Sequence, residues 1–570
     1  MSHRFRVWAP RAERVEVVVD RQRLAMAADG GGWWSRTVGS AGTGSDYAFS
    51  LDGGPARPDP RSGWQPAGVD GPSRLVDHRS FPWTDQSWRG LFLPSAVLYE
   101  LHVGTFTPEG TFEAVIGRLD HLAELGVDGI ELLPVAEFSG ERGWGYDGVD
   151  LYAPHHSYGG PDGLKRLVDA CHARSLGVVM DVVYNHLGPA GNYLPEFGPY
   201  FTDEHHTPWG SAVDLRRPEV RRFFLDNALM WLRDYHLDGL RLDAVHALVD
   251  DSATHLLEEM AQEVAALGAQ LGKTLFLVAE SDLNDPKVID PHGWRMDGQW
   301  CDDVHHALHA LLTGETSGYY VDFGSLETTA KALTSAFVHD GSWSTFRGRP
   351  HGRPVPADIP GWRLVVYLQD HDQVGNRALG DRPALSPGLA RVGAALYLLS
   401  PYTPMLFMGE EYGARTPWLF FSDHSGALGD AVREGRRTEF AMHGWSTDEV
   451  PDPQDPATFE RSKLDWQADA GLLHFYRELI ALRRSRTDLS DGRRDHVGVT
   501  WDEDARWLVM TRGSVAICCN LAPKRQALAV PGSPQHLLLA SAPGWTFQDQ
   551  RVETDGESVV VVELAPHPRS

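Results

Sequence analysis

The chain has 570 residues, of which 42% are hydrophobic and 23% charged, as in an ordinary globular protein of two or more domains. Its 78 acidic residues outnumber 52 Lys and Arg, and the formal net charge of −26 argues against nucleic acid or an anionic membrane surface as a partner. No apolar run is long enough to span a membrane, the N-terminus lacks a signal-peptide segment, and the four cysteines form no repeated framework, so we expect a reduced, cytoplasmic protein.

Short strands are expected in the first part of the chain. Residues 5–8 and 15–19 have strand-like patterns, and Gly- or Pro-rich clusters such as residues 29–32 separate such runs. A polar, proline-bearing stretch around residues 81–85 resembles a linker. We therefore expect a β-sandwich over residues 1–92.

From about residue 96, short apolar runs alternate with longer helical segments. Pro218 is a favourable first-turn residue, and Val220, Phe224 and Trp231 follow it at roughly helical spacing. Alternating strands and helices predict an α/β fold, a (β/α)8 TIM barrel over residues 93–487 with a short insertion after strand 3. The eight expected strands cover residues 97–103, 129–133, 178–183, 239–242, 275–279, 298–300, 364–368 and 404–408.

The end of the chain returns to short strands, and we expect a C-terminal antiparallel β domain over residues 488–570. Its expected strands include residues 497–501, 507–511, 515–519 and 559–562.

Charged side chains stand at the expected strand ends, where a TIM barrel carries its active site. Arg241 and Asp243 fall on one face of their strand because side chains alternate, and a neighbouring cation favours the ionised carboxylate that a glycosyl nucleophile needs. A plain salt bridge at a strand end is the alternative reading of this pair.

The next strand is apolar and ends in Glu280, where partial loss of water would raise the carboxyl pKa toward about 6–7 and suit a general acid. A loop or helix-capping carboxylate is the alternative. Asp243 and Glu280 end neighbouring strands, and neighbouring strands lie about 4.8 Å apart. This spacing would suit a retaining glycosidase, whose two carboxyl groups lie about 5–5.5 Å apart.

Two further polar clusters, residues 181–186 and 370–373, end other strands and offer imidazoles, amides and carboxylates for sugar hydroxyls. A metal site is the competing interpretation of a chain with 26 histidines. The adjacent pairs 155–156, 205–206 and 305–306 disfavour it, because neighbouring side chains do not face each other on a helix. The 19 tryptophans suit stacking on sugars, with core filling as the alternative.

Together, residues 181–186, 239–246, 280 and 371–372 resemble, in order and spacing, the four signature regions of the α-amylase family of glycoside hydrolases. The resemblance implies that Asp243 is the nucleophile, Glu280 the general acid/base and Asp372 the carboxylate that grips the distorted sugar. It implies that Arg241 holds Asp243 ionised and that Asp181 organises the loops. We also expect seven further residues to bind the sugar, some of them implied by the resemblance: Tyr146, Trp144, His186, His246, His371, Asp282 and Gln373.

Within that family, nearly the whole chain is similar to the trehalose-releasing maltooligosyltrehalose trehalohydrolases. The similar stretches include residues 99–107, 145–154, 279–286, 305–315, 408–413, 420–424 and 432–440. One departure is Asp370, where the family usually has Asn, and we expect it to add a charge close to Asp372.

This narrower resemblance implies a carbohydrate-binding-like N-terminal sandwich and cleavage of the α-1,4 bond next to the terminal α,α-trehalose of maltooligosyl trehalose. The products would be trehalose and a malto-oligosaccharide, a synthase would supply the substrate, and neither cofactor nor metal would be needed. Trehalose would be recognised near Trp209, residues 282–285 or the segment after Gly413.

The alternatives are a glycogen branching enzyme and a non-catalytic glycan-binding protein on the same fold. Branching enzymes usually carry Glu where this chain has Gln373, and they usually have a different stretch at residues 409–414. A protein that had lost catalysis would be expected to lack the acid or the nucleophile, whereas Asp243, Glu280 and Asp372 are all present.

Overall fold

The computed structural model describes residues 2–207, 210–442 and 450–565. At its centre, eight parallel strands close into a barrel in the order β9, β10, β13, β16, β17, β18, β21 and β22. These strands coincide with the eight expected from the sequence, so the prediction of a TIM barrel is confirmed. Their bounds are β9 (Leu98–Leu101), β10 (Gly129–Leu132), β13 (Gly177–Val182), β16 (Gly239–Leu242), β17 (Phe276–Ala279), β18 (Gly298–Trp300), β21 (Leu364–Tyr367) and β22 (Thr403–Phe407).

The barrel strands are buried along their whole length, which explains why they appear in the sequence as apolar runs rather than alternating ones. A few charged side chains interrupt these runs at matching positions. Glu100 of β9 is in register with Glu131 of β10, and Asp181 of β13 is in register with Arg241 of β16. All four are buried. The strands therefore bring charged groups together inside a barrel that is otherwise apolar.

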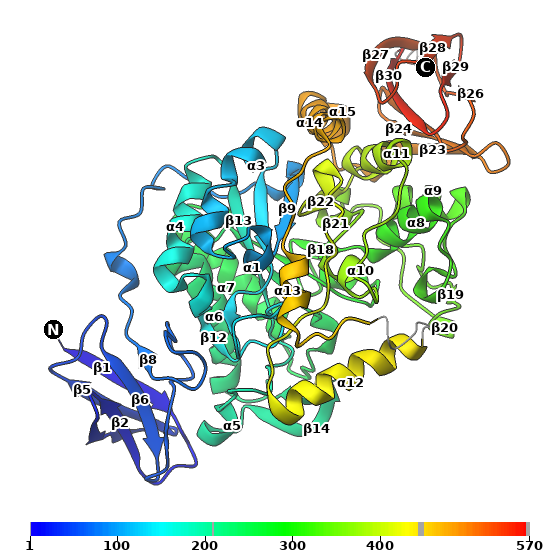
Figure 1. The fold of residues 1–570 in the computed structure, drawn as a ribbon. Helices are drawn as coiled ribbons and strands as arrows, with labels where there is room; N and C mark the ends of the chain where they lie inside the picture. The colour runs from blue at the N-terminus through cyan, green and yellow to red at the C-terminus, as the bar shows by residue number, and fades with distance from the viewer. Residues whose placement is uncertain (1, 208–209, 443–449, 566–570) are drawn as a thin grey trace.

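Helices cover the outside of the barrel (Figure 1). The helix expected to begin at Pro218 does so, and it buries Val220, Phe224 and Trp231. The α-helices are α1 (Val103–Phe106), α2 (Phe112–Ile116), α3 (Leu119–Leu125), α4 (Gly160–His172), α5 (Leu194–Phe197), α6 (Pro218–Asp234), α7 (Leu256–Leu271), α8 (Asp302–Thr313), α9 (Leu326–Ser335), α10 (His371–Gly375), α11 (Pro387–Leu398), α12 (Gly426–Met442), α13 (Pro456–Ser462), α14 (Ala470–Ser485) and α15 (Thr487–Ser490).

The connection between β17 and β18 differs from the expected repeat of strand and helix. Residues 280–297 are all described, and they form a single short 3-10 turn, η5 (Pro286–Val288), instead of an α-helix. Pro286 and Pro291 lie five positions apart, and each removes a backbone donor and disfavours the helical conformation in the residue before it. The loop that follows Glu280 is therefore irregular.

Short antiparallel strands decorate the loops at other points of the barrel. They are β11 (Ala136–Glu137) with β12 (Asp150–Pro154), β14 (Phe201–Thr207) with β15 (Gly210–Val213), and β19 (Trp343–Ser344) with β20 (Arg349–Pro350). The β14–β15 hairpin lies in the segment after strand 3, where the sequence predicts an insertion. The expected recognition residue Trp209 lies outside the described residues.

A β-sandwich and an antiparallel β domain flank the barrel at opposite ends of the molecule (Figure 1). The first contains β1 (His3–Trp8), β2 (Val15–Val19), β3 (Gln22–Ala25), β4 (Ala27–Gly30), β5 (Trp33–Val38), β6 (Asp46–Leu51), β7 (Ala56–Arg57) and β8 (Ser73–Arg74). The second contains β23 (Val497–Asp502), β24 (Trp507–Arg512), β25 (Val515–Asn520), β26 (Gln526–Ala529), β27 (Pro534–Ala540), β28 (Trp545–Gln548), β29 (Arg551–Thr554) and β30 (Ser558–Leu564). The predicted fold class is confirmed, whereas the boundaries at residues 92 and 487 stay a prediction.

None of the helices that the structure describes is long and apolar enough to cross a membrane. The four cysteines, Cys171, Cys301, Cys518 and Cys519, are all buried, and none forms a disulfide in the described structure.

Candidate active site

Asp243 and Glu280 follow the last residues of the neighbouring strands β16 and β17. The backbone NH of Asp243 donates to the carbonyl of Val182 at 3.0 Å, and that of Glu280 donates to the carbonyl of Leu242 at 2.9 Å. These bonds continue the parallel ladder by one residue beyond each strand. They place both carboxyl groups at the C-terminal edge of the barrel, where TIM-barrel enzymes hold their catalytic residues.

The carboxylate of Asp243 is held by two donors. Nη1 of Arg241 lies 2.8 Å from Oδ1 of Asp243, and Nδ2 of Asn185 donates to Oδ2 at 2.9 Å. Arg241 is fully buried, and its guanidinium lies 4.3 Å from the ring centroid of Trp300. The contact expected from strand alternation is therefore present, and it fixes the orientation of Asp243.

Glu280 lies on the other side of the same guanidinium. Its Oε2 accepts from the backbone NH of Ala244 at 2.6 Å and lies 3.8 Å from Nη2 of Arg241. Burial, opposed by Arg241 and reinforced by Asp243, raises the pKa of Glu280 to about 8. The direction agrees with the sequence prediction and the value exceeds it, so Glu280 is protonated at neutral pH and can donate a proton.

The turn after Asp243 is strained. Ala244 has a φ of +41°, a left-handed conformation that is uncommon for a residue with a side chain. This conformation points the NH of Ala244 at Oε2 of Glu280. Ala244 thus follows Asp243 in the chain and donates a hydrogen bond to the side chain of Glu280.

His371 and Tyr146 form a second layer of the site. Nε2 of His371 lies 2.7 Å from the hydroxyl of Tyr146, which also donates to Oδ2 of Asp181 at 2.6 Å. The other ring nitrogen of His371 contacts Oε1 of Glu100 at 2.6 Å. Burial alone would lower the pKa of His371, but Asp372 and Glu100 outweigh it and raise the pKa to about 10. His371 is therefore a buried cation among carboxylates.

Asp372 lies at the start of α10, with 43% of its side chain exposed. Its Oδ1 accepts from Nδ2 of Asn376 at 3.1 Å and lies 3.5 Å from Nε2 of His371. Gln373, the next residue, is half-buried. Asp372 is thus a partly exposed carboxylate beside the buried pair of Tyr146 and His371.

Asp370 caps α10, and its carboxyl group is buried in the fold. Oδ1 accepts from the backbone NH of Gln373 at 2.6 Å, whereas Oδ2 is buried without a hydrogen-bond partner among the described residues. Burial and the nearby Glu100 raise the pKa of Asp370 well above its ordinary value. This favours the neutral acid, which has the shape of the Asn usual at this position, because a buried unpaired charge is costly.

Trp144 and His186 support the site from the loops. The indole of Trp144 is buried, donates to the carbonyl of Leu419 at 2.9 Å and stacks on Trp418 at 5.4 Å. Nε2 of His186 lies 2.8 Å from the carbonyl oxygen of Tyr146. Burial lowers the pKa of His186, so this imidazole is neutral. Direct contact of Trp144 and His186 with a sugar stays a prediction.

His246 and Asp282 lie together beyond Glu280. Nδ1 of His246 accepts from the backbone NH of Asp282 at 3.3 Å, and the carboxylate of Asp282 pairs with the guanidinium of Arg347. Arg347 belongs to the hairpin of β19 and β20. The hairpin is therefore joined by an ion pair to the loop that follows Glu280.

One group of described side chains has the arrangement of metal ligands: Glu137, His155 and His156, whose ligand atoms all lie within 4.8 Å of one another. The helical argument against adjacent histidines does not apply to this pair, because His155 follows β12 and His156 begins a 3-10 turn, η3 (His156–Tyr158). Nδ1 of His156 contacts Oε1 of Glu137 at 2.7 Å, and the backbone NH of His156 donates to Oε2 at 2.8 Å. Both carboxylate oxygens of Glu137 therefore have hydrogen-bond partners within the protein.

Sequence reasoning missed Glu100, Asp302 and Arg347 as site residues, and it offered Asn185 for sugar hydroxyls rather than as the partner of Asp243. Asp302 begins α8, accepts from the hydroxyl of Tyr367, and has a pKa raised by burial to about 6. A charged residue inside an apolar strand was the available signal for Glu100. Arg347 carries no such signal, because its partner Asp282 is 65 positions away.

Known proteins resemble the chain along its whole length. The family model described as "Alpha amylase, catalytic domain" matches residues 78–198, and that of a domain of unknown function matches residues 492–561. A malto-oligosyltrehalose trehalohydrolase of Arthrobacter ramosus is 53% identical, covering 99% of this chain and 100% of the relative. A crystal structure of a "putative alpha amylase" from Salmonella typhimurium superposes with a TM-score of 0.91 at 40% identity, covering 99% of this chain and 98% of that chain.

The expected alternative matches less of the chain. A 1,4-alpha-glucan branching enzyme of Corynebacterium jeikeium is 33% identical over 43% of this chain and 38% of its own length. Full-length similarity is thus found with the trehalohydrolases and partial similarity with the branching enzyme. Together with the barrel and the paired carboxyl groups at its C-terminal edge, this places the chain in the malto-oligosyltrehalose trehalohydrolase family.

Proposed function

We propose that the protein hydrolyses the α-1,4-glucosidic bond next to the terminal α,α-trehalose unit of maltooligosyl trehalose, with retention at the anomeric carbon. The products are trehalose and a shorter malto-oligosaccharide. The observation that carries the proposal is the pairing of two carboxyl groups with different surroundings on neighbouring strands. Asp243 is held by Arg241 and Asn185, and the pKa of Glu280 is raised to about 8.

In the first step, Asp243 attacks the anomeric carbon while Glu280 gives its proton to the glycosidic oxygen of the leaving trehalose. A covalent glucosyl ester forms on Asp243, and the bond to trehalose breaks. The contact of both carboxyl groups with one guanidinium supports the short separation that this route requires.

In the second step, Glu280, now deprotonated, removes a proton from water, which attacks the same anomeric carbon and releases Asp243. The proton returns to Glu280, so the enzyme is restored without an external cofactor. Arg241 would stabilise the carboxylate of Asp243 both before attack and when it leaves.

The remaining residues have proposed roles on either side of the cleaved bond. Asp372, partly exposed beside His371, would bind hydroxyls of the distorted sugar, and Tyr146 would stack against that sugar. The other proposed sugar contacts are Trp144, His186, His371 and Gln373, with His246 and Asp282 on the trehalose side.

The proposed partners follow from the substrate. A maltooligosyltrehalose synthase would have to convert the reducing end of a malto-oligosaccharide into the trehalose unit before this enzyme could act. A cytoplasmic location would keep both enzymes with their substrates.

A product assay tests the specificity. The protein is incubated with maltotriosyl trehalose and, separately, with maltopentaose, and the products are separated by chromatography. We expect trehalose plus maltotriose from the first substrate and slow cleavage of the second. Proton NMR at the earliest time points should show the α-anomer of the new reducing end, as retention requires.

Other product patterns would contradict the proposal. Equal cleavage of both substrates would indicate a general amylase, and formation of α-1,6 branches on amylose would indicate the branching enzyme. Binding of both oligosaccharides without any cleavage would indicate the glycan-binding alternative.

A further inference from the structure

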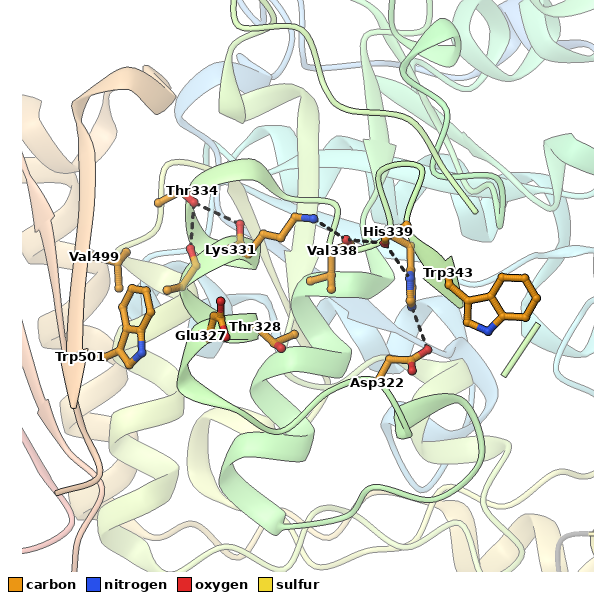
Figure 2. A pocket seen from close by; sticks show the side chains of 12 residues that line it. Asp322, Glu327, Thr328, Lys331, Thr334, Val338, His339, Trp343, Val499 and Trp501 are labelled. Atoms are coloured by element: carbon orange, nitrogen blue, oxygen red, sulfur yellow. Dashed lines mark hydrogen bonds and ion pairs between the residues drawn. The ribbon is translucent and has the colours of Figure 1, made fainter. Parts of the chain in front are cut away.

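A pocket of about 590 Å³ lies between the barrel and the C-terminal β domain, and it shares no lining residue with the active-site cluster (Figure 2). Its lining comes from helix α9 and the loops on either side of it, from β19 and from β23 of the C-terminal domain. Its volume is within the range of small-molecule binding sites, about 300–1,000 Å³.

Two exposed tryptophans mark the pocket. Trp343 on β19 is 61% exposed, and Trp501 on β23 is 40% exposed. They stand at opposite ends of the labelled row of side chains in Figure 2, with the residues of α9 between them. Exposed indoles leave a large apolar face in water and are common where a ligand later covers them.

The groups between the two indoles are polar and held in place. Nζ of Lys331 donates to the carbonyl of Val338 at 2.8 Å and to Oδ1 of Asp340 at 2.9 Å, which uses two of its three protons. Nε2 of His339 lies 3.5 Å from Oδ2 of Asp322. The pocket therefore offers a fixed polar lining rather than a purely apolar one.

The elements that form the pocket are joined to each other. The carboxylate of Glu503, directly after β23, accepts from the backbone NH of Leu326 at 2.9 Å, where α9 begins. On the other side, Trp343 belongs to the hairpin whose Arg347 pairs with Asp282, two residues beyond Glu280. One hairpin thus lines the pocket and also reaches the catalytic edge of the barrel.

We propose that this pocket binds a segment of α-1,4-linked glucan at a second site, separate from the site of cleavage; the choice of glucan rests on the proposed function. Pyranose rings have apolar CH faces that stack on indoles and a rim of hydroxyl groups that bond to polar side chains. The lining supplies both, with Trp343 and Trp501 for the faces and Lys331, His339 and Asp322 for the rim.

The charge of the lining favours a neutral ligand over an anion. Among the described residues that line the pocket, Lys331 is the one Lys or Arg, whereas Asp322 and Glu327 are carboxylates. A phosphate or sulfate group would meet net negative charge there. A neutral glucan meets no such cost.

A second glucan site would act through effective concentration. A chain held at the pocket cannot diffuse away, so its trehalose end returns to the active site more often than an untethered one. This gain is available to chains long enough to reach both sites and not to short substrates. The pocket would therefore set a preference for long substrates without touching the reacting bond.

The test compares Trp343→Ala, Trp501→Ala and the double variant with Phe92→Ala, a matched control because Phe92 is 63% exposed and does not line the pocket. Affinity for soluble amylose is measured by retardation in native gels, in an Asp243→Asn background that cannot consume the polymer. We expect the double variant to bind amylose about tenfold more weakly than the control, which is about 1.4 kcal/mol. Trp501→Phe should keep most of the affinity.

Activity gives the second readout, in proteins with Asp243 intact. The double variant should keep kcat/KM on maltotriosyl trehalose within about twofold and lose several-fold on a long trehalose-ended chain, because only the long chain gains from the tether. Retardation equal to that of Phe92→Ala, or an equal loss on both substrates, would overturn the second site. Tryptophan-dependent retardation in a protein that releases no trehalose would uphold the pocket and reject the proposed function instead.

Discussion

At the scale of single residues, one buried cation organises three carboxyl groups. Nη1 of Arg241 contacts Asp181 at 2.6 Å and Asp243 at 2.8 Å, and Nη2 lies 3.8 Å from Glu280. Burial raises the pKa of Asp181 to about 6 and that of Glu280 to about 8, so these groups do not share one protonation state at neutral pH. A raised pKa of this kind keeps on Glu280 the proton that a general acid must donate.

Glu280→Gln and Asp243→Asn should each abolish most turnover while preserving the fold. Gln cannot protonate the leaving oxygen, and general acid catalysis contributes about 10²–10⁴-fold to the rate. We expect losses of at least that size in kcat on maltotriosyl trehalose, with unchanged circular dichroism. Glu113→Gln, a change at a surface carboxylate 69% exposed, is the control and should behave as wild type. A near-normal rate in either active-site variant would refute the assigned role.

The pH dependence of kcat/KM should have an alkaline limb set by Glu280. Its pKa is raised, to about 8, so the proton needed for catalysis is present below that pH and is lost as the pH rises through it. The profile should therefore fall with an apparent pKa near 8. A substrate with a fluoride leaving group needs no proton and should lack this limb; if it shows the same limb, another group is titrating.

At the scale of elements, the strand ends were predictable and the long loops were not. The barrel strands are apolar on both faces, so they stand out in the sequence, and the residue after each strand must lie at the catalytic edge. Asp243 and Glu280 could be placed in this way from their positions alone. The irregular connection after β17 and the hairpin of β19 and β20 have no periodic signal.

Arg347→Ala should weaken substrate binding on the trehalose side. Without the guanidinium, the loop with Asp282 loses its tie to the hairpin, and the position of His246 loosens with it. We expect KM for maltotriosyl trehalose to rise about three- to tenfold, or about 1 kcal/mol, with kcat changed less. Arg347→Lys should recover part of the loss. An unchanged KM would show that the pair has no part in recognition.

At the scale of the whole molecule, arginines join the flanking domains to the barrel. Arg57 of the sandwich pairs with Glu196 of α5 at 2.8 Å, and Arg512 of β24 donates to the carbonyl of Leu399 at 2.9 Å. Within the barrel domain, Arg483 of α14 is 2% exposed and donates to the carbonyls of Leu398, Ser400 and Tyr402 at 2.7–2.8 Å. Arg483 and Arg512 thus donate hydrogen bonds to backbone carbonyl groups at the end of α11 and in the segment that follows it.

Arg483→Leu should destabilise the protein without changing its chemistry. It leaves three buried carbonyl groups without donors, and we expect a loss of about 2–4 kcal/mol in the free energy of unfolding. Thermal unfolding should show a lower Tm, while kcat/KM at 25 °C stays near wild type. Arg525→Leu, at a residue 44% exposed, should leave Tm almost unchanged. Equal Tm values for the two variants would contradict the role given to Arg483.

By itself, the sequence determined the eight barrel strands, the helix at Pro218, and the positions of Asp243 and Glu280 relative to Arg241. These depend on local patterns, the burial of each strand and the alternation of side chains along it. Only the tertiary structure decided that Asn185 holds Asp243, across 58 positions, and that Glu100 holds His371, across 271. It also decided that Asp370 is buried and that Trp343 and Trp501 share a pocket, because burial and contacts between distant segments arise only when the chain is folded.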